Sequence, residues 1–409
     1  MVGKRNNDER KKGRRRMSYF VGVFLFALGI AVTIALHEFG HFAIARLSGM
    51  RVRRFFVGFG PTVWKFRRGN TDYGFKALPL GGFCDIAGMT ALDEMTPEEE
   101  PHAMYKKPAW RRIAVMSGGI AMNILVGTVI LYGLAVTTGL PNPNPDVTPV
   151  VAETKCIGEG CSGNGPAYEA GIRPGDAIRT VAGVDTPSFL DVRNEVFLHP
   201  GETVDVTVER DNTTLTFPVA IGSAEATFPD DTTKTVGVMG VSSAPIKDAY
   251  LTYGPVEGIG ATASYAGDLF VATWDGLKSF PGKIPSVVAS IFGGERDQSS
   301  PMSVVGASRV GGELVERSLW AMFWMLLSNL NYFLALFNLI PLPPLDGGHI
   351  AVVIYEKIRD AIRRLRGLAP AGPADYTKLM PVTYAASLAL LLIGGLVIVA
   401  DVVNPIKLF

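Results

Sequence analysis

Cysteine and charge are both scarce in this chain of 409 residues. Three cysteines are too few for a disulfide framework, which excludes the small, disulfide-stabilised class of secreted protein. Cys156 and Cys161 are close in sequence, and whether they form a disulfide stays open, whereas Cys84 stands alone and is interpreted as structural. Charged residues make up only 19%, and the net formal charge of +1 says little because the charges are segregated. We expect no nucleic-acid partner.

Long apolar stretches are abundant instead. Hydrophobic residues make up 48% of the chain and the mean hydropathy is +0.24. A helix needs about 20 mainly apolar residues to cross a bilayer. Four stretches are long enough, at about 19–36 (continuing as helix to 47), 113–136, 319–340 and 384–403. We therefore predict a polytopic α-helical membrane protein with about four spans, located as a multi-pass protein in the plasma (inner) membrane.

The charges are segregated along the chain. Residues 140–317 carry 12 Lys and Arg against 23 Asp and Glu, whereas residues 46–112 carry 12 against 7. Basic residues collect in short cytoplasmic loops, so the loops between spans one and two and between spans three and four are predicted to be cytoplasmic. The acidic region is then extracytoplasmic. The basic N-terminal tail, residues 1–16, favours the opposite orientation, and translation starting at Met17 would remove the conflict.

The stretch "TIALHEFGHFAIARLSG", residues 33–49, places ionisable side chains inside the first apolar run. His37 and His41 are four residues apart, so both side chains leave one face of a helix. Glu38 can reach a water molecule held between them. This H-E-x-x-H spacing is typical of zinc metalloproteases, and ionisable residues within a span are usually functional. The alternative is a hydrogen-bonded polar cluster inside a helix bundle.

A catalytic zinc ion needs three protein ligands and one open position for water. "NLIPLPPLDGGHI", residues 338–350, ends the third apolar run with a lone carboxylate, Asp346. Because successive spans alternate in direction, His41 and Asp346 are expected at the same membrane face. We predict one zinc ion held by His37, His41 and Asp346, with Glu38 as the general base. The alternative third ligand is His349. The alternative role for Asp346 is to cap the helix that begins near His349.

These two motifs together resemble those of the site-2 protease family, in particular the bacterial intramembrane zinc metalloproteases with a PDZ domain. The resemblance rests on His37-Glu38-x-x-His41 in a first span and on Asn338-x-x-Pro341-x-Pro343-x-Leu345-Asp346-Gly347 at the end of a later one. Two further segments resemble the family's membrane-associated β-loop, Gly58-Phe59-Gly60-Pro61 and Pro79-Leu80-Gly81-Gly82-Phe83. The resemblance implies that the substrate is bound by Asn338, Asn123, Gly58, Phe59 and Gly60. A structural hydrogen bond between helices is the alternative for Asn338.

The region from Val52 to Phe83 alternates in hydrophobicity around Gly69-Asn70, which predicts a β-hairpin. An exposed edge strand there can pair with an unwound substrate segment through backbone hydrogen bonds. The alternative is a plain cytoplasmic hairpin without a substrate role.

Residues 147–243 are predicted to form one β-rich domain. "PAYEAGIRPGDAIRTVAGVDTPSFLDVRNEV" followed by "GETVDVTVERDNTTLTFPVAI" resembles a PDZ domain, with a groove helix at Asp191–Leu198 and a strand at Thr203–Val208. Such a domain binds the ends of peptides or excludes bulky substrates, and we favour the size filter. Residues 244–317 are mildly amphipathic and are expected to lie along the membrane surface. The remaining segments are the span pair at 17–136 and the span pair at 318–409.

Together these features predict a zinc-dependent intramembrane endopeptidase of regulated intramembrane proteolysis. The family resemblance implies a pre-cleaved, single-span membrane protein as the substrate, either an anti-sigma factor or a signal-peptide remnant. A non-catalytic PDZ adaptor that binds protein tails is the main alternative, and the presence of Glu38 argues against it. A zinc transporter is a weaker alternative, because it needs ligands distributed across the membrane.

Overall fold

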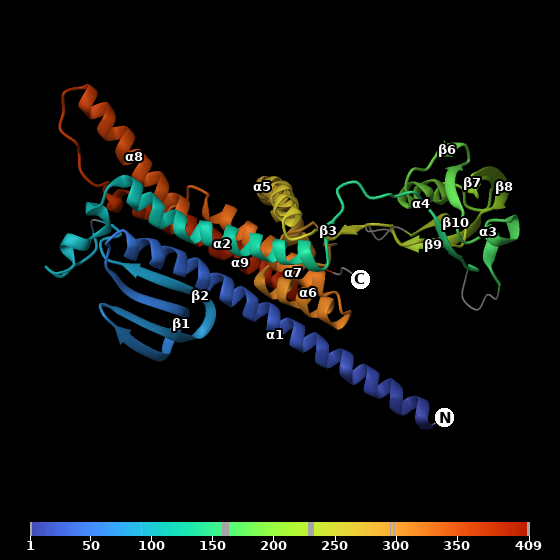
Figure 1. Cartoon of the computed structure of the whole chain (residues 1–409), viewed down its shortest axis with the longest axis horizontal. Coiled ribbons are helices and arrows are strands. Elements are labelled where there is room, and N and C mark those ends of the chain that lie inside the picture. The colour runs from blue at the N-terminus through green and yellow to red at the C-terminus, as the bar shows by residue number, and fades with distance from the viewer. Residues whose placement is uncertain are drawn as a thin grey trace. The chain divides into compact units, whose positions relative to one another are not determined.

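The computed structural model describes residues 2–90, 92–157, 163–227, 233–294, 296–297 and 299–406. It divides into two compact units (Figure 1). Residues 139–251 form the second unit, and the chain on both sides of it forms the first. The spans and the predicted zinc ligands all belong to the first unit, and residues 147–243, predicted to form a PDZ-like domain, lie within the second.

Four helices of the first unit are long and apolar enough to cross a membrane. They are α1 (Val2–Leu47), α2 (Ala109–Thr137), α7 (Trp320–Asn338) and α9 (Met380–Val403). Their candidate spans cover Arg15–Leu47, Ala109–Thr137, Trp320–Asn338 and Tyr376–Val403. Each overlaps one predicted stretch, so the four predicted spans are confirmed as candidate spans within the described residues. The backbone of the basic N-terminal segment continues α1 without a break.

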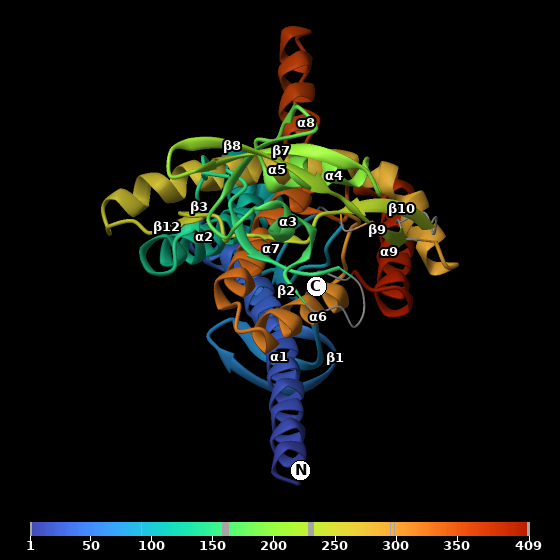
Figure 2. The same ribbon diagram turned by 90° about the vertical axis from the view of Figure 1, so that its right-hand side faces the viewer.

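Three more helices complete the first unit. They are α5 (Glu257–Ile291), α6 (Val304–Glu316) and α8 (Asp346–Leu365), with short 3₁₀ turns at Glu100–His102, Met104–Lys106 and Tyr376–Leu379. Figure 1 views α5 nearly along its axis and Figure 2 shows it from the side, so α5 runs across the direction of the spans. None of the three is a candidate span. The expectation that residues 244–317 lie on the membrane surface stays a prediction.

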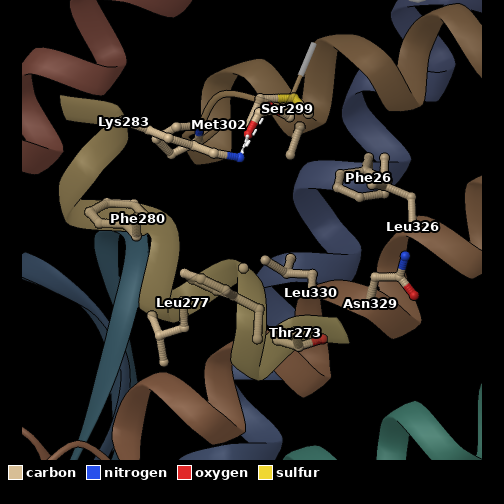
Figure 3. Close-up of a pocket in the computed structure, with 14 residues that line it drawn as sticks. Phe26, Thr273, Leu277, Phe280, Lys283, Ser299, Met302, Leu326, Asn329 and Leu330 are labelled. Atoms are coloured by element: carbon tan, nitrogen blue, oxygen red, sulfur yellow. Dashed lines mark hydrogen bonds between the residues drawn. The ribbon is translucent and has the colours of Figure 1, made fainter. Parts of the chain in front are cut away.

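An apolar cavity of about 320 Å³ lies where α5 passes α1 and α7 (Figure 3). Phe26, Leu277 and Leu330 contribute apolar side chains to it, and Lys283 at its edge donates hydrogen bonds to Ser299. Among the described residues that line this cavity, none is a predicted catalytic or metal-binding residue. The predicted chemistry is therefore located elsewhere in the first unit.

A small sheet follows α1 directly. β1 (Val52–Arg68) and β2 (Thr71–Ile86) pair around a turn at Gly69 and Asn70, which confirms the predicted hairpin. Val57 pairs with Phe75 and also with Gly82, so the first part of β1 lies between two segments of β2. Residues 82–86 consequently form an edge segment, a name kept below.

Buried side chains fix the ends of this sheet against the spans. Val52 and Ile86, which pair with each other, share an apolar cluster with Ala45 from α1 and with Val115 and Met116 from α2. Burial of such side chains contributes roughly 1.5–3 kcal/mol each. The cluster therefore holds the edge segment close to the C-terminal end of α1, where the H-E-x-x-H motif lies.

The second unit is β-rich. A four-stranded sheet in the order β6-β5-β7-β8 packs with α4 around an apolar core that includes Ile178, Val192 and Val206. The predicted groove helix is observed as α4 (Phe189–Phe197), and the predicted strand is contained in β7 (Thr203–Arg210). The other elements are α3 (Gly165–Ala170), β3 (Leu140–Pro141), β4 (Val151–Thr154), β5 (Ala177–Val181), β6 (Val184–Asp185), β8 (Thr213–Ala220), β9 (Gly222–Thr227), β10 (Thr233–Val238), β11 (Val241–Ser243) and β12 (Tyr250–Leu251).

Two predictions about the second unit remain open. The PDZ assignment of the fold stays a prediction. The disulfide alternative involves Cys161, which lies outside the described residues.

Candidate metal centre

The two histidines of the H-E-x-x-H motif converge on one point. His37 and His41 lie one turn apart on α1, and their Nε2 atoms are 3.1 Å from each other. His41 Nδ1 lies 2.8 Å from the backbone carbonyl of Val115 on α2. A ring nitrogen that donates to a carbonyl leaves the other nitrogen free as a metal ligand and fixes the ring orientation. The histidines are therefore oriented with Nε2 toward a shared site.

Asp346 reaches the same point from α8. After α7 ends at Asn338, the proline-containing segment Leu339–Leu345 makes tight turns before α8 begins. A Cβ added at Gly348 would lie 2.1 Å from the carbonyl oxygen of Leu342, so only glycine fits this turn. Asp346 Oδ2 lies 3.3 Å from the Nε2 atom of His37 and 3.3 Å from that of His41. The structure thus brings the three predicted ligands together.

The three residues fit a zinc ion. Tetrahedral zinc with bonds of about 2.0–2.1 Å separates its ligand atoms by about 3.3–3.4 Å. The observed separations are 3.1, 3.3 and 3.3 Å. Asp346 Oδ2 and His37 Nδ1 are buried without a hydrogen-bond partner. Two imidazoles and one carboxylate are also the donor set of a common type of catalytic zinc site. Geometry and chemistry therefore agree on zinc.

Gly119 on α2 closes one side of this site. A Cβ at this position would lie 2.4 Å from His41 Nε2 and 2.6 Å from His37 Nε2. Any side chain would occupy the space in front of the ligand atoms, so the backbone approaches the site closely only because the residue is glycine. We did not predict a role for this residue from the sequence. The available signal was the pair Gly118-Gly119 inside an apolar span.

The edge segment passes beside Glu38. A Cβ added at Gly82 would lie 3.1 Å from Cγ of Glu38, and the carboxylate is also close to the backbone of Cys84. The thiol of Cys84 is free. The carboxylate predicted as general base is therefore situated between the histidines of its own helix and a strand edge.

Electrostatics keep the third ligand charged. Burial alone would raise the pKa of Asp346, but the nearby imidazoles of His37 and His41 outweigh it and hold the pKa below its ordinary value. Burial lowers the pKa of His349, whose ring lies 6.1 Å from that of Tyr376. Within the described part of the chain, the ligand cluster consists of His37, His41 and Asp346. The geometry therefore favours Asp346 over the alternative His349.

The predicted substrate-binding residues occupy different surroundings. Asn123 is buried on α2, one turn beyond Gly119, and neither polar atom of its side chain has a hydrogen-bond partner. Asn338 is half-buried at the last residue of α7. Gly58 and Gly60 have positive φ angles in β1, and Phe59 between them stacks on Phe83 of the edge segment. Their roles toward a substrate stay predictions.

The chain is similar to a known peptidase family and to proteins named as zinc metalloproteases. The sequence model of peptidase family M50 matches residues 25–370. The zinc metalloprotease Rip1 of Mycolicibacterium smegmatis is 46% identical, over 96% of this chain and 100% of the relative. The zinc metalloprotease Rip1 of Mycobacterium tuberculosis is 44% identical over the same shares. The matched region of the family includes both motifs that supply the ligand cluster.

Proposed function

Because this chain belongs to peptidase family M50, we propose that it is a zinc-dependent endopeptidase that cuts membrane proteins in or beside a transmembrane segment. The observation that carries the proposal is the convergence of His37, His41 and Asp346 next to Glu38 on candidate spans and their ends. The similarity to relatives named zinc metalloproteases supports the same metal and reaction class.

The reaction is hydrolysis of a peptide bond. His37, His41 and Asp346 would hold the metal, which when bound would lower the pKa of a water molecule and polarise the scissile carbonyl. Glu38 accepts a proton from the attacking water and later delivers it to the leaving nitrogen. Val115 keeps His41 in the tautomer that ligates through Nε2. Gly119 leaves free the space in front of the Nε2 atoms of His37 and His41.

The edge segment is the proposed docking strand for the substrate. A transmembrane helix must unwind before cleavage, and its freed amides then need new hydrogen-bond partners. Strand addition supplies them with little sequence requirement. Gly82 lies against Glu38, so a peptide paired with residues 82–86 would pass the general base. Phe59, packed on Phe83, and the glycines beside it would support this edge.

The substrate class follows from the family resemblance. We propose a single-span protein that another protease has already shortened, either an anti-sigma factor or a signal-peptide remnant. The PDZ-like unit would act as a size filter. A cavity of about 340 Å³ between α4 and residues 237–241, lined by Val192, Val196 and Met239, also suits an extended peptide end. This cavity favours a peptide-binding role for the same unit as the second candidate.

Substitution of the general base tests the proposed function. Glu38→Gln should keep zinc bound and lower the cleavage rate at least about 100-fold, because only proton transfer is removed. Zinc content is measured by metal analysis of the purified full chain. Cleavage is measured on a co-expressed single-span protein shortened to a stub outside the membrane. The matched control is Glu169→Gln on the exposed surface of the second unit, which should cleave at the wild-type rate.

Two results would contradict the proposal. Undiminished cleavage by Glu38→Gln would remove the assigned base. Equal cleavage of the stub and of the same protein with its whole outer domain would remove the size filter but leave the enzyme assignment intact.

A further inference from the structure

One buried ion pair joins α2 to α8 on the same side of the molecule as the ligand cluster. Arg112 Nη1 donates to Glu356 Oε2 at 2.5 Å, and Arg112 Nη2 donates to Oε1 at 3.4 Å. Only 6% of Arg112 and 7% of Glu356 is exposed. Burying two charges is costly before their attraction is counted, so a buried ion pair is weak evidence for stability. We therefore expect another role for this pair.

Arg112 belongs to the face of α2 that forms the site. Arg112, Val115 and Gly119 are spaced by three and four residues, which places them on one side of a helix. Val115 accepts the hydrogen bond that orients His41, and Gly119 leaves room for the metal. One face of α2 therefore contacts both histidines directly and reaches the helix of the third ligand through Arg112.

Glu356 is the corresponding contact on α8. It lies ten residues after Asp346, so the two are about 15 Å apart along the helix axis. The far end of α8 projects away from the spans (Figure 1), and Tyr355 and Ile358, on either side of Glu356, are 57% and 56% exposed. Glu356 Oε1 also accepts a hydrogen bond of 2.7 Å from the amide of Ala374, in the segment that leads to α9. A single carboxylate thus connects α2, α8 and the chain that follows α8.

We propose that Arg112 and Glu356 form a positioning pair for the third zinc ligand. Asp346 lies in the first turn of α8, and Ile350 one turn later packs on the apolar cluster that contains Val115 and Met116 of α2. The ion pair fixes a second point of α8 against α2, and two fixed points define the direction of the helix. The pair thereby sets where the Asp346 carboxylate stands relative to the histidines that the same α2 face orients.

A second buried ion pair provides a matched control. Arg296 and Asp401, with side chains 2% and 1% exposed, are paired at 2.5 Å. Asp401 Oδ2 also accepts a hydrogen bond from the amide of Ser303 ahead of α6. This pair connects α9 with the segment between α5 and α6, and its residues are on elements other than α1, α2 and α8. Its loss should destabilise the protein without moving a zinc ligand.

The test compares zinc affinity with stability in the full chain purified in detergent. Glu356→Gln should raise the zinc dissociation constant about 10-fold, as for supporting partners of metal ligands, and should shift the visible absorption of the cobalt-substituted protein. Arg112→Lys keeps the charge but loses the two-pronged contact, so an intermediate dissociation constant is expected. Asp401→Asn should lower the thermal midpoint and leave both metal readouts at their wild-type values.

The inference rests on the proposed zinc site, and the outcomes separate the two. Failure of the wild-type chain to bind zinc would refute the site itself. Zinc binding by the wild type, with Glu356→Gln within about twofold of its dissociation constant, would refute only the positioning role. Equal weakening of zinc binding by Asp401→Asn would also refute it, because general destabilisation would then account for the effect. If Glu356→Gln does not fold, Arg112→Lys alone decides between these outcomes.

Discussion

At the residue scale, Gly119 leaves open the space in front of the ligand atoms. Gly119→Ala would place a methyl carbon 2.4 Å from His41 Nε2 and 2.6 Å from His37 Nε2. Neither the histidines, fixed on α1, nor the backbone of α2 can retreat far in a close-packed bundle. We expect zinc affinity to fall more than about 10-fold, comparable to the loss of a supporting contact, together with cleavage. Metal analysis after dialysis against a weak chelator measures the first effect.

The same helix supplies the control for this substitution. A Cβ added at Gly133 meets no atom within 4 Å, and alanine favours helix over glycine by roughly 1 kcal/mol. Gly133→Ala should therefore bind zinc as the wild type does. Normal zinc content in Gly119→Ala would show that the site lies farther from α2 than the structure places it.

The functional role of ionisable residues inside apolar stretches could be predicted from the sequence. The role of a residue that acts through close contact between two helices could not. His37, Glu38 and His41 stand out because ionisable groups are costly within a span, and Asp346 stands out as the lone carboxylate at the end of another. Gly119 has only a weaker signal, the pair Gly118-Gly119 inside an apolar span. Its role depends on the distance between α1 and α2, which the sequence of either helix does not contain.

At the element scale, α6 packs on α1 through glycine. A Cβ added at Gly311 would lie 2.7 Å from three atoms of the Phe26 side chain, which is fully buried. Such overpacking typically costs about 1–3 kcal/mol. Gly311→Ala should therefore lower the thermal midpoint of the purified protein. Gly267→Ala on α5, where nothing lies within 4 Å, is the control, and equal midpoints for both variants would contradict this packing.

The four candidate spans followed from length and hydropathy, but the elements between them were harder to predict. The hairpin at Gly69 and Asn70 is confirmed, yet its double pairing at Val57 was not anticipated. Alternating hydrophobicity in one strand indicates that the strand pairs with another, but it does not show how many strands it pairs with. Local propensity counts against glycine in a helix, so the close contact of the α6 glycines with α1 was not predicted from the sequence.

At the scale of the whole molecule, the ligand cluster shows which ends of the spans lie at the same membrane face. His41 lies near the C-terminal end of α1, Gly119 is in the N-terminal half of α2, and Asp346 follows the C-terminal end of α7. Spans that alternate in direction meet these conditions together only if all three positions are at one membrane face. The basic loop between α1 and α2 belongs to that face, and the rule for basic loops predicts that it is cytoplasmic.

Reporter fusions test this orientation. A reporter that is active only outside the cytoplasm should be active when fused after Val136, at the end of α2, and inactive when fused after Ile340, beyond α7. A reporter that fluoresces only in the cytoplasm should give the opposite pattern at the same two positions. Both fusions keep the H-E-x-x-H helix, so its contribution to insertion is equal in each. The reversed pattern would place the ligand cluster on the far side of the membrane and would put the second unit in the cytoplasm. In that case the basic N-terminal segment of α1, and not the two later loops, would determine how the protein inserts.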